Sequence, residues 1–268
     1  MKKLFAALII SAFAAGCSTN PVTGRSQFKL VPEQELQAMA AQEYQQFLSS
    51  NKVVASSNNR DAAMVKRVGS RVTNAVKSYY ASRNLSDALA GFTWEYNLVN
   101  DPAVNAWAMP GGRIVVYTGL LGVTKNEAAL AAVIGHEISH AIFKHGNERM
   151  SQGLAQQLGG AALSIALANQ PAQTQNLFNT AYGIGTNVGV LLPFSRKQES
   201  EADRYGLIWM AMAGYNPQEA IPLWERMEAA SSGNRPPEFL STHPSENTRM
   251  TNLRKWMPEA LKYYKPMK

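Results

Sequence analysis

The sequence predicts an α+β fold that is mostly helical and contains one small β-sheet. Apolar residues recur at helical spacing through most of the chain after residue 32. Alternating apolar and polar residues, which are typical of strands, are confined to residues 92–117. A length of 268 residues and a hydrophobic content of 46% are sufficient for one large globular domain.

The first sixteen residues are predicted to be a signal peptide. Lys2 and Lys3 precede the apolar segment Leu4 to Ala15, which is shorter than the ~20 residues needed to cross a bilayer. Small residues before Cys17 are typical of a bacterial lipoprotein signal, and a plain secretory signal is the alternative. Cys17 is the only cysteine, so it is the expected site of lipidation and no intrachain disulfide can form.

A lipidated Cys17 predicts where the protein is located. Ser18 follows the cysteine, and a residue other than Asp at this place usually indicates sorting to the outer membrane. The lipid is then the expected membrane anchor. The expected organisation is a signal peptide over 1–16, a lipidated tether over 17–32 and a single domain over 33–268 that faces the periplasm.

Two helices are predicted ahead of the strands. Glu33 to Ser49 begins beside Pro32, and proline favours the first turn of a helix. After a polar loop from Asn51 to Asn59, the second helix covers Asp61 to Tyr80. Its apolar stripe consists of Val65, Val68, Val72 and Val76.

Three strands are predicted next. Phe92 to Val99 alternates between apolar and polar residues. Pro110-Gly111-Gly112 predicts a turn that joins a strand at Val104 to Met109 with another at Arg113 to Tyr117.

The segment from Met150 to Ser195 contains no charged residue. Two transmembrane helices are one interpretation. Asn and Gln residues interrupt its apolar runs, which fall well short of ~20 residues, so a helical hairpin packed on the neighbouring helices is favoured. Further helices are predicted at Ser195 to Ala213, Gln218 to Ala230 and Pro244 to Met257, with a loop rich in proline and glycine from Ser231 to Ser241.

The motif His136-Glu137-Ile138-Ser139-His140 indicates a zinc site that activates water. It follows a run of strong helix formers after Asn126, a suitable N-cap residue. Two histidines four residues apart lie on one face of a helix, so both can bind Zn²⁺ and leave positions for a third ligand and a water. Glu137 is placed to take a proton from that water. A chance occurrence of the pattern is the alternative.

The third zinc ligand is predicted in the next acidic segment, Glu199 to Asp203. Glu199 and Asp203 are four residues apart and share a helix face, whereas Glu201 points away. Glu199 is therefore the expected ligand, and Asp203 is expected to hold the second ring nitrogen of a ligating histidine. Glu201 is expected to pair with Lys197 or Arg204. Three solvated surface charges are the alternative.

Together these motifs resemble the zinc metallopeptidases of the HtpX and CAAX-prenyl-protease type. The resemblance covers about residues 90–255 and includes Asn105 to Gly112, Gly119-Leu120-Leu121 and Ser241-Thr242-His243-Pro244-Ser245. Within the family, the chain is similar to periplasmic lipoproteins such as BepA and LoiP. The resemblance implies a mostly helical zincin fold of the gluzincin type over 33–268, and it adds Asp203 to the catalytic residues.

The same resemblance implies how a substrate binds. The strand that carries Asn105, Ala106, Trp107 and Ala108 is expected to be an edge strand that faces the active-site cleft. An exposed edge can pair with the backbone of an extended peptide whatever its side chains. Unfolded or extended polypeptides are therefore the expected partners.

Two further histidines receive different interpretations. In the family, the region of His243 lies near the zinc cleft, so this residue is expected either to stabilise the oxyanion or to occupy the fourth zinc position and hold the enzyme inactive. A helix-capping or solvent-exposed histidine is the alternative. His145 lies about 140° around the helix from His140 and is expected to be structural.

The predicted function is that of a metalloendopeptidase with one zinc ion per chain, acting on misfolded or mistargeted cell-envelope proteins. A latent, protease-like lipoprotein that works as a chaperone or assembly factor is the alternative. Nucleic-acid binding is excluded, because the net charge of +7 is scattered and lacks interleaved aromatic residues. The sequence does not fix the oligomeric state.

Overall fold

The structure is a computed structural model that describes residues 17–158, 174–176, 178, 194–231, 237–243 and 248–267. The predicted signal peptide, 1–16, and most of the hairpin predicted within Met150 to Ser195 lie outside the described residues. No helix in the described part of the chain is long and apolar enough to cross a membrane. Helices predominate and the strands form two small sheets, so the α+β prediction is confirmed.

The larger sheet has four strands in the order β3-β4-β6-β5. Their bounds are β3 (Val53–Val54), β4 (Glu95–Val99), β5 (Ala106–Met109) and β6 (Arg113–Tyr117). β4 and β6 are parallel, whereas β3 and β5 are antiparallel to their neighbours. The three predicted strands are confirmed: β6 has the predicted bounds, β4 and β5 begin later than predicted, and β5 lies at an edge. The sequence did not indicate β3, because two valines in a polar loop become a strand only by pairing with Val99 and Leu98 of β4.

The smaller sheet is a hairpin within the segment predicted as a tether. Its strands are β1 (Cys17–Thr19) and β2 (Ser26–Phe28), which pair antiparallel with Cys17 opposite Phe28. The hairpin packs against the body of the protein, since the Gln27 amide donates to the Phe143 carbonyl and the Tyr205 hydroxyl donates to the Val22 carbonyl. Residues 17–28 of this segment therefore include a hairpin that contacts the rest of the protein.

The predicted helices before and after the larger sheet occur in the predicted order, and further helices that were not predicted lie between them. Their bounds are α2 (Glu33–Ser50), α3 (Arg60–Ala81), α4 (Thr118–Thr124), α5 (Glu127–Ile142), α6 (His145–Leu158), α9 (Arg196–Met212), α10 (Ala220–Ser231), α11 (Phe239–Thr242) and α12 (Arg249–Leu261). Short 3₁₀ helices, η1 (Ser86–Leu89) and η3 (Pro217–Glu219), complete the described elements. The predicted last helix begins later, at Arg249, and α11 lies at the end of the segment predicted as a loop.

The motif helix is shorter than predicted. The Asn126 side chain caps α5 by accepting a hydrogen bond from the Ala129 N–H, as its sequence indicates. The helix ends at Ile142 and does not reach His145, although the angle expected between His140 and His145 assumed one continuous helix. Lys144 adopts a left-handed conformation with φ 58°, and His145 begins the next helix, α6. His145 is therefore not on the same helix as the motif.

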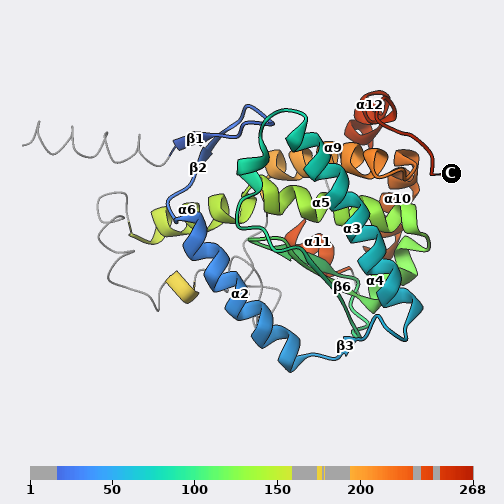
Figure 1. Cartoon of the computed structure of the whole chain (residues 1–268), viewed down its shortest axis with the longest axis horizontal. Coiled ribbons are helices and arrows are strands. Elements are labelled where there is room, and N and C mark those ends of the chain that lie inside the picture. The colour runs from blue at the N-terminus through green and yellow to red at the C-terminus, as the bar shows by residue number, and fades with distance from the viewer. Residues whose placement is uncertain are drawn as a thin grey trace, which may run out of the picture.

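Helices α5 and α9 lie against each other through the middle of the molecule (Figure 1). Their backbones approach closely where Gly135 meets Gly206: a Cβ at Gly135 would lie 2.9 Å from the Gly206 carbonyl oxygen. A larger residue at either position would force the helices apart. This contact is one residue from His136, so the two glycines set how near the acidic residues of α9 come to the motif.

One face of the four-stranded sheet is covered by α3 and α5. The apolar stripe of α3 is fully buried there, with Val65, Val68, Val72 and Val76 at 0% exposure, as the sequence predicted. α2 packs beside the edge strand β5, where Trp107 contacts Tyr44 and Phe47. The motif helix thus lies between the sheet and α9 in a rigid core.

Candidate metal centre

The motif side chains of α5 point into the protein. His136, Glu137 and His140 are only 1–2% exposed. The two histidines lie one helical turn apart on the same face, and their Nε2 atoms are 2.9 Å apart. Two imidazole nitrogens therefore face the same point in the interior.

The first turn of α9 brings a carboxylate to this point. Ser195 and Gln198 form a capping box that fixes the start of the helix. Glu199 then lies with its carboxylate oxygens 3.6 Å from His136 Nε2 and 3.3 Å from His140 Nε2. The structure thus brings together the three side chains that the sequence proposed as ligands.

Asp203 lies one turn further along α9 and holds the opposite nitrogen of His136. Its Oδ1 is 2.8 Å from His136 Nδ1. Arg249 donates to both oxygens of Asp203, which makes this carboxylate an acceptor only. His136 therefore carries its proton on Nδ1 and presents a lone pair from Nε2, which is the form that binds a metal.

His243 is the fourth member of the cluster. It follows α11 directly and is 2% exposed. Its Nδ1 is 3.2 Å from His136 Nε2 and 3.0 Å from a Glu199 oxygen, and its Nε2 is 3.4 Å from Glu137 Oε1. His243 is therefore not solvent-exposed: its backbone N–H caps α11 by donating to the Phe239 carbonyl, while its side chain lies in the cluster.

The cluster fits a zinc ion. Among the described residues, ligand atoms of His136, His140, Glu199 and His243 lie within 4.8 Å of one another. Imidazole nitrogen and carboxylate oxygen are donors that Zn²⁺ prefers, and three or four of them are the usual number. The Glu137 Oε1 atom beside them is buried and has no hydrogen-bond partner. An orphaned carboxylate oxygen next to a metal centre is available to a water molecule.

Arg249, at the start of α12, holds the two carboxylates of α9 in place. It donates to Glu199 (2.9 Å) and to Asp203 (2.8 and 3.0 Å), and its guanidinium lies 3.6 Å above the ring of Trp224. The sequence places an arginine six residues after His243 but gave no reason to assign it this role.

The pKa values of these carboxylates follow from their neighbours. Burial alone raises the pKa of Asp203, but Arg249 and His136 outweigh it and lower the pKa below the ordinary value. Burial likewise opposes ionisation of Glu199, yet interactions with His243 and His136 hold its pKa well below the ordinary range. Both groups are therefore carboxylates near neutral pH.

The pKa of Glu137 shifts in the opposite direction. Burial raises its pKa to about 8, with Glu199 adding to the shift while His136 and the backbone N–H of Ala108 oppose it. A carboxyl group poised in this range exchanges a proton near neutral pH, as a general base must. The hydrogen bond also places Glu137 directly beside the edge strand β5.

The raised pKa predicts a pH-dependent stability change. The unfolded group has an ordinary pKa of 4.5, so folding takes up a proton between pH 4.5 and 8. A raised carboxyl pKa makes wild type lose stability as pH rises through this interval. We expect metal-free Glu137→Gln to match wild type below pH 4.5, to become increasingly more stable up to pH 8, and to gain ~5 kcal/mol at most. Urea unfolding in a chelator at several pH values measures this difference, and a gap that does not change with pH contradicts it.

The pairing predicted for Glu201 was wrong. Glu201 does not pair with Lys197 or Arg204: its Oε2 is 2.9 Å from His145 Nε2 and 2.7 Å from Arg25 Nε. Arg204 pairs with Glu259 instead. His145 begins α6, and its Nδ1 lies 3.0 Å from His140 Nδ1. The helix is interrupted after Ile142 by Lys144 with φ 58°, so the angle expected for a continuous helix does not apply.

The proposed substrate strand is β5 with the preceding Asn105. Asn105 and Ala106 are buried, and Trp107 packs on α2. Ala108 is nearest to the cluster, because its N–H donates to Glu137. The side chains therefore serve packing, and the backbone edge is what the strand offers to a partner.

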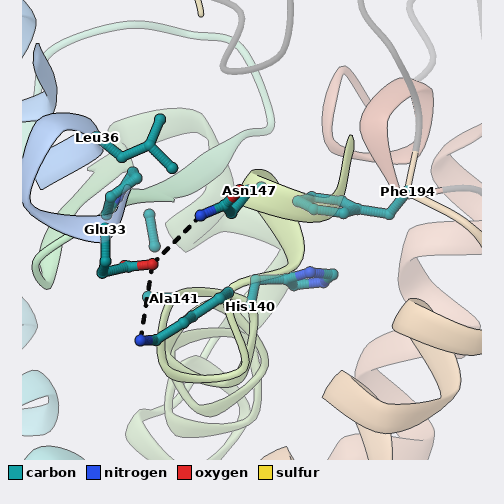
Figure 2. A pocket seen from close by; sticks show the side chains of 10 residues that line it. Glu33, Leu36, His140, Ala141, Asn147 and Phe194 are labelled. Carbon is teal, nitrogen blue, oxygen red and sulfur yellow. Dashed lines mark hydrogen bonds and ion pairs between the residues drawn. The ribbon is translucent and has the colours of Figure 1, made fainter. Parts of the chain in front are cut away.

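A small pocket lies beside His140, between the start of α2, the end of β5 and the start of α6 (Figure 2). Leu36, Ala108, Pro110, Ala141 and Phe194 form much of its wall. At its margin a Glu33 oxygen lies 3.7 Å from Lys144 Nζ and 3.4 Å from the Asn147 amide nitrogen. The pocket is thus mostly apolar, with polar groups on one side.

Comparison with known proteins identifies one matching family model, peptidase family M48, over residues 60–257. A mitochondrial metalloendopeptidase OMA1 of Schizosaccharomyces pombe is 36% identical over 70% of this chain and 53% of its own length. The human metalloendopeptidase OMA1 is 28% identical over 96% of this chain and 49% of its own length. The beta-barrel assembly-enhancing protease of Escherichia coli is 33% identical over 60% of this chain and 34% of its own length.

These matches correct two expectations. The relatives of Schizosaccharomyces pombe, Arabidopsis thaliana, Saccharomyces cerevisiae and Homo sapiens are named as mitochondrial proteases, which contradicts the prediction of a periplasm-facing lipoprotein on an outer membrane. The peptidase family is shared with both groups, so the narrower likeness to the periplasmic lipoprotein branch is not specifically supported. The chain spans about half the length of several of these relatives.

Proposed function

The chain belongs to peptidase family M48 and is a zinc metalloendopeptidase, and we propose that it binds one zinc ion per chain and cleaves unfolded segments of misfolded or mistargeted proteins. The observation that carries this proposal is the convergence of His136, His140 and Glu199 beside the buried Glu137, whose Oε1 has no hydrogen-bond partner. Donors for a metal and a general base thus meet next to the edge strand β5.

The roles of the residues follow from their positions. His136, His140 and Glu199 hold the zinc, and Asp203 orients His136. Zinc bound there supplies a Lewis acid and lowers the pKa of water toward ~7. Glu137 accepts the proton of the attacking water and transfers it to the leaving amine. Burial of all these groups keeps bulk water away from the reacting bond.

The substrate binds along β5 in this proposal. The Ala108 N–H points from the strand edge to Glu137, so a peptide paired with this edge passes the catalytic carboxylate. Because backbone pairing tolerates different side chains, the proposal favours extended, unfolded segments as substrates and predicts little sequence selectivity.

The alternative of a latent, chaperone-like protein is favoured by one observation, the position of His243. Its Nδ1 lies among the ligand atoms of His136 and Glu199. A histidine in the fourth position would exclude water and keep the protease inactive until the segment that carries it moves. The protein would then have an inactive state, with His243 in the fourth position, and an active state, with His243 moved away.

The variant His243→Ala distinguishes the two roles of His243. If the side chain fills the fourth position, its removal opens this position and basal cleavage of casein rises. If it instead donates to the oxyanion, cleavage falls by roughly 10²–10³-fold. We expect the rise, because Nδ1 already faces the ligand atoms. A fall in activity with zinc retained contradicts latency and supports the catalytic role.

The proposed function is tested with the purified chain. We expect about one zinc per chain by elemental analysis, cleavage of casein and of peptides blocked at both ends, and slower cleavage of a stable folded protein. Blocked peptides separate an endopeptidase from an exopeptidase. Removing zinc with a chelator abolishes the activity and restoring zinc recovers it. A zinc-loaded chain with His243→Ala that still cleaves no unfolded protein contradicts the proposal.

A further inference from the structure

The two histidines of the motif are supported in different ways. His136 contacts the carboxylate of Asp203 directly. His140 contacts a third histidine: its Nδ1 lies 3.0 Å from Nδ1 of His145, which is fully buried at 0% exposure. Beyond it, His145 Nε2 lies 2.9 Å from a carboxylate oxygen of Glu201, and the same oxygen accepts from Arg25 Nε at 2.7 Å.

The end of this chain of contacts fixes where the protons lie. Glu201 is paired with the Arg25 guanidinium, so it is an ionised acceptor. The proton between Glu201 and His145 therefore belongs to His145 Nε2. A neutral imidazole has one N–H, which leaves a lone pair on His145 Nδ1. This lone pair accepts the Nδ1–H of His140, so His140 presents its own lone pair from Nε2.

The opposite arrangement is incompatible with metal binding. If His145 carried its proton on Nδ1, it would donate to His140 Nδ1, and the proton of His140 would move to Nε2. That proton would then point at His136 Nε2, 2.9 Å away, and at the Glu199 carboxylate. His140 Nε2 would have no lone pair for a metal. The contacts of Glu201 thus decide whether His140 is a competent ligand.

The far end of these contacts is the N-terminal hairpin. Arg25 lies just before β2, and its guanidinium also donates to both oxygens of Glu148 on α6, at 2.7 and 2.6 Å. Gln27 of β2 donates to the Phe143 carbonyl at the end of α5 and to Glu148. Figure 1 shows the hairpin beside the start of α6. The hairpin therefore braces the site where α5 ends, just after His140.

We propose that His145, Glu201 and Arg25 form a positioning relay that sets the protonated nitrogen and the ring orientation of His140 and ties this ligand to the N-terminal hairpin. The proposal rests on zinc binding by the proposed ligand set. None of the three residues touches the substrate, so they act through His140. Partners of this kind typically contribute about 10–100-fold to metal affinity.

The test compares two substitutions of His145. His145→Phe keeps an aromatic ring but removes the acceptor, whereas His145→Asn provides an amide oxygen near the position of Nδ1. Zinc affinity is measured by competition with a chromogenic chelator, and the visible absorption of the cobalt-substituted protein reports the ligand geometry. We expect His145→Phe to bind zinc about 10–100-fold more weakly and to change the cobalt spectrum. His145→Asn recovers most of the affinity and the spectrum.

A second pair of variants tests the link to the hairpin. Arg25→Met removes the cation that pairs with Glu201 of α9. The control, Arg204→Met, removes a cation that lies on α9 itself and pairs with Glu259 of α12. We expect Arg25→Met to weaken zinc binding by up to about 10-fold and Arg204→Met to leave it unchanged. Thermal unfolding of the metal-free forms shows whether each variant folds. If His145→Phe does not fold, the zinc affinities of His145→Asn, Arg25→Met and Arg204→Met test the proposal.

The outcomes separate this proposal from the proposed function. If the wild-type chain binds no zinc, the proposed function fails. If wild type binds zinc and cleaves casein, but His145→Phe or Arg25→Met binds zinc as wild type does, the relay is overturned. Equal weakening by His145→Phe and His145→Asn also overturns it, because ring packing instead of the acceptor would then support His140.

Discussion

Glu137→Gln is expected to lose proteolysis while retaining zinc and the fold. Glutamine has nearly the shape of glutamate and can still meet the Ala108 N–H, but it cannot accept the proton of water. His136, His140 and Glu199 are unchanged, so metal binding persists. General base catalysis contributes typically about 10²–10⁴-fold, and a loss of this size in kcat/KM is expected with casein or a blocked peptide.

The matched control for this variant is Glu127→Gln. Glu127 lies on the same helix, at the surface, where it pairs with Arg67. The same change of charge there is expected to leave cleavage and zinc content as in wild type. Substantial residual cleavage by purified Glu137→Gln that persists after chelator treatment would exclude zinc chemistry as the source of the activity.

Glu199→Ala is expected to cause the largest loss of zinc. Its carboxylate is the only one of the described residues within 4 Å of the Nε2 atoms of both His136 and His140. Removing it deletes a ligand and also leaves the buried cation of Arg249 with one carboxylate partner fewer. We expect zinc affinity to fall by more than the ~10–100-fold that loss of an outer partner produces.

The order among three alanine variants makes this prediction specific. Glu201→Ala is expected to weaken zinc binding to an intermediate extent, because Glu201 acts only through His145. Glu259→Ala, which removes a surface partner of Arg204, is expected to have no effect. Metal analysis after dialysis against a weak chelator ranks the three variants. Equal zinc content in Glu199→Ala and Glu259→Ala contradicts the ligand assignment.

Local sequence patterns were sufficient to predict the main helices and the longer strands. The valine stripe of α3, the N-cap Asn126 of α5 and the alternation in β4 each depend on residues that are neighbours in the chain. The same holds for the spacing of His136 and His140 and of Glu199 and Asp203, since four residues on a helix share one face. These predictions needed no knowledge of what lies across the core.

Other features depend on partners that are distant in the sequence. β3 exists because Val53 and Val54 meet β4, and the N-terminal segment is ordered because Arg25 and Gln27 reach α5, α6 and α9. The helix break at Lys144 was also missed. No glycine marks the break, and a lysine with positive φ is uncommon.

The chain's own pattern of residues therefore predicted a zinc-binding helix, a general base on it and an acidic partner helix, because spacing along a helix fixes which side chains share a face. Packing across the core determined which residues contact the motif side chains. The contact of Gly135 with Gly206 sets the distance between α5 and α9, and it lets Glu199 reach both histidines. The interruption at Lys144 lets the His145 ring contact His140, and Glu201 contacts His145 instead of lying free at the surface. Such contacts join residues far apart in the sequence, and their direction depends on how whole elements pack, which helical periodicity does not encode.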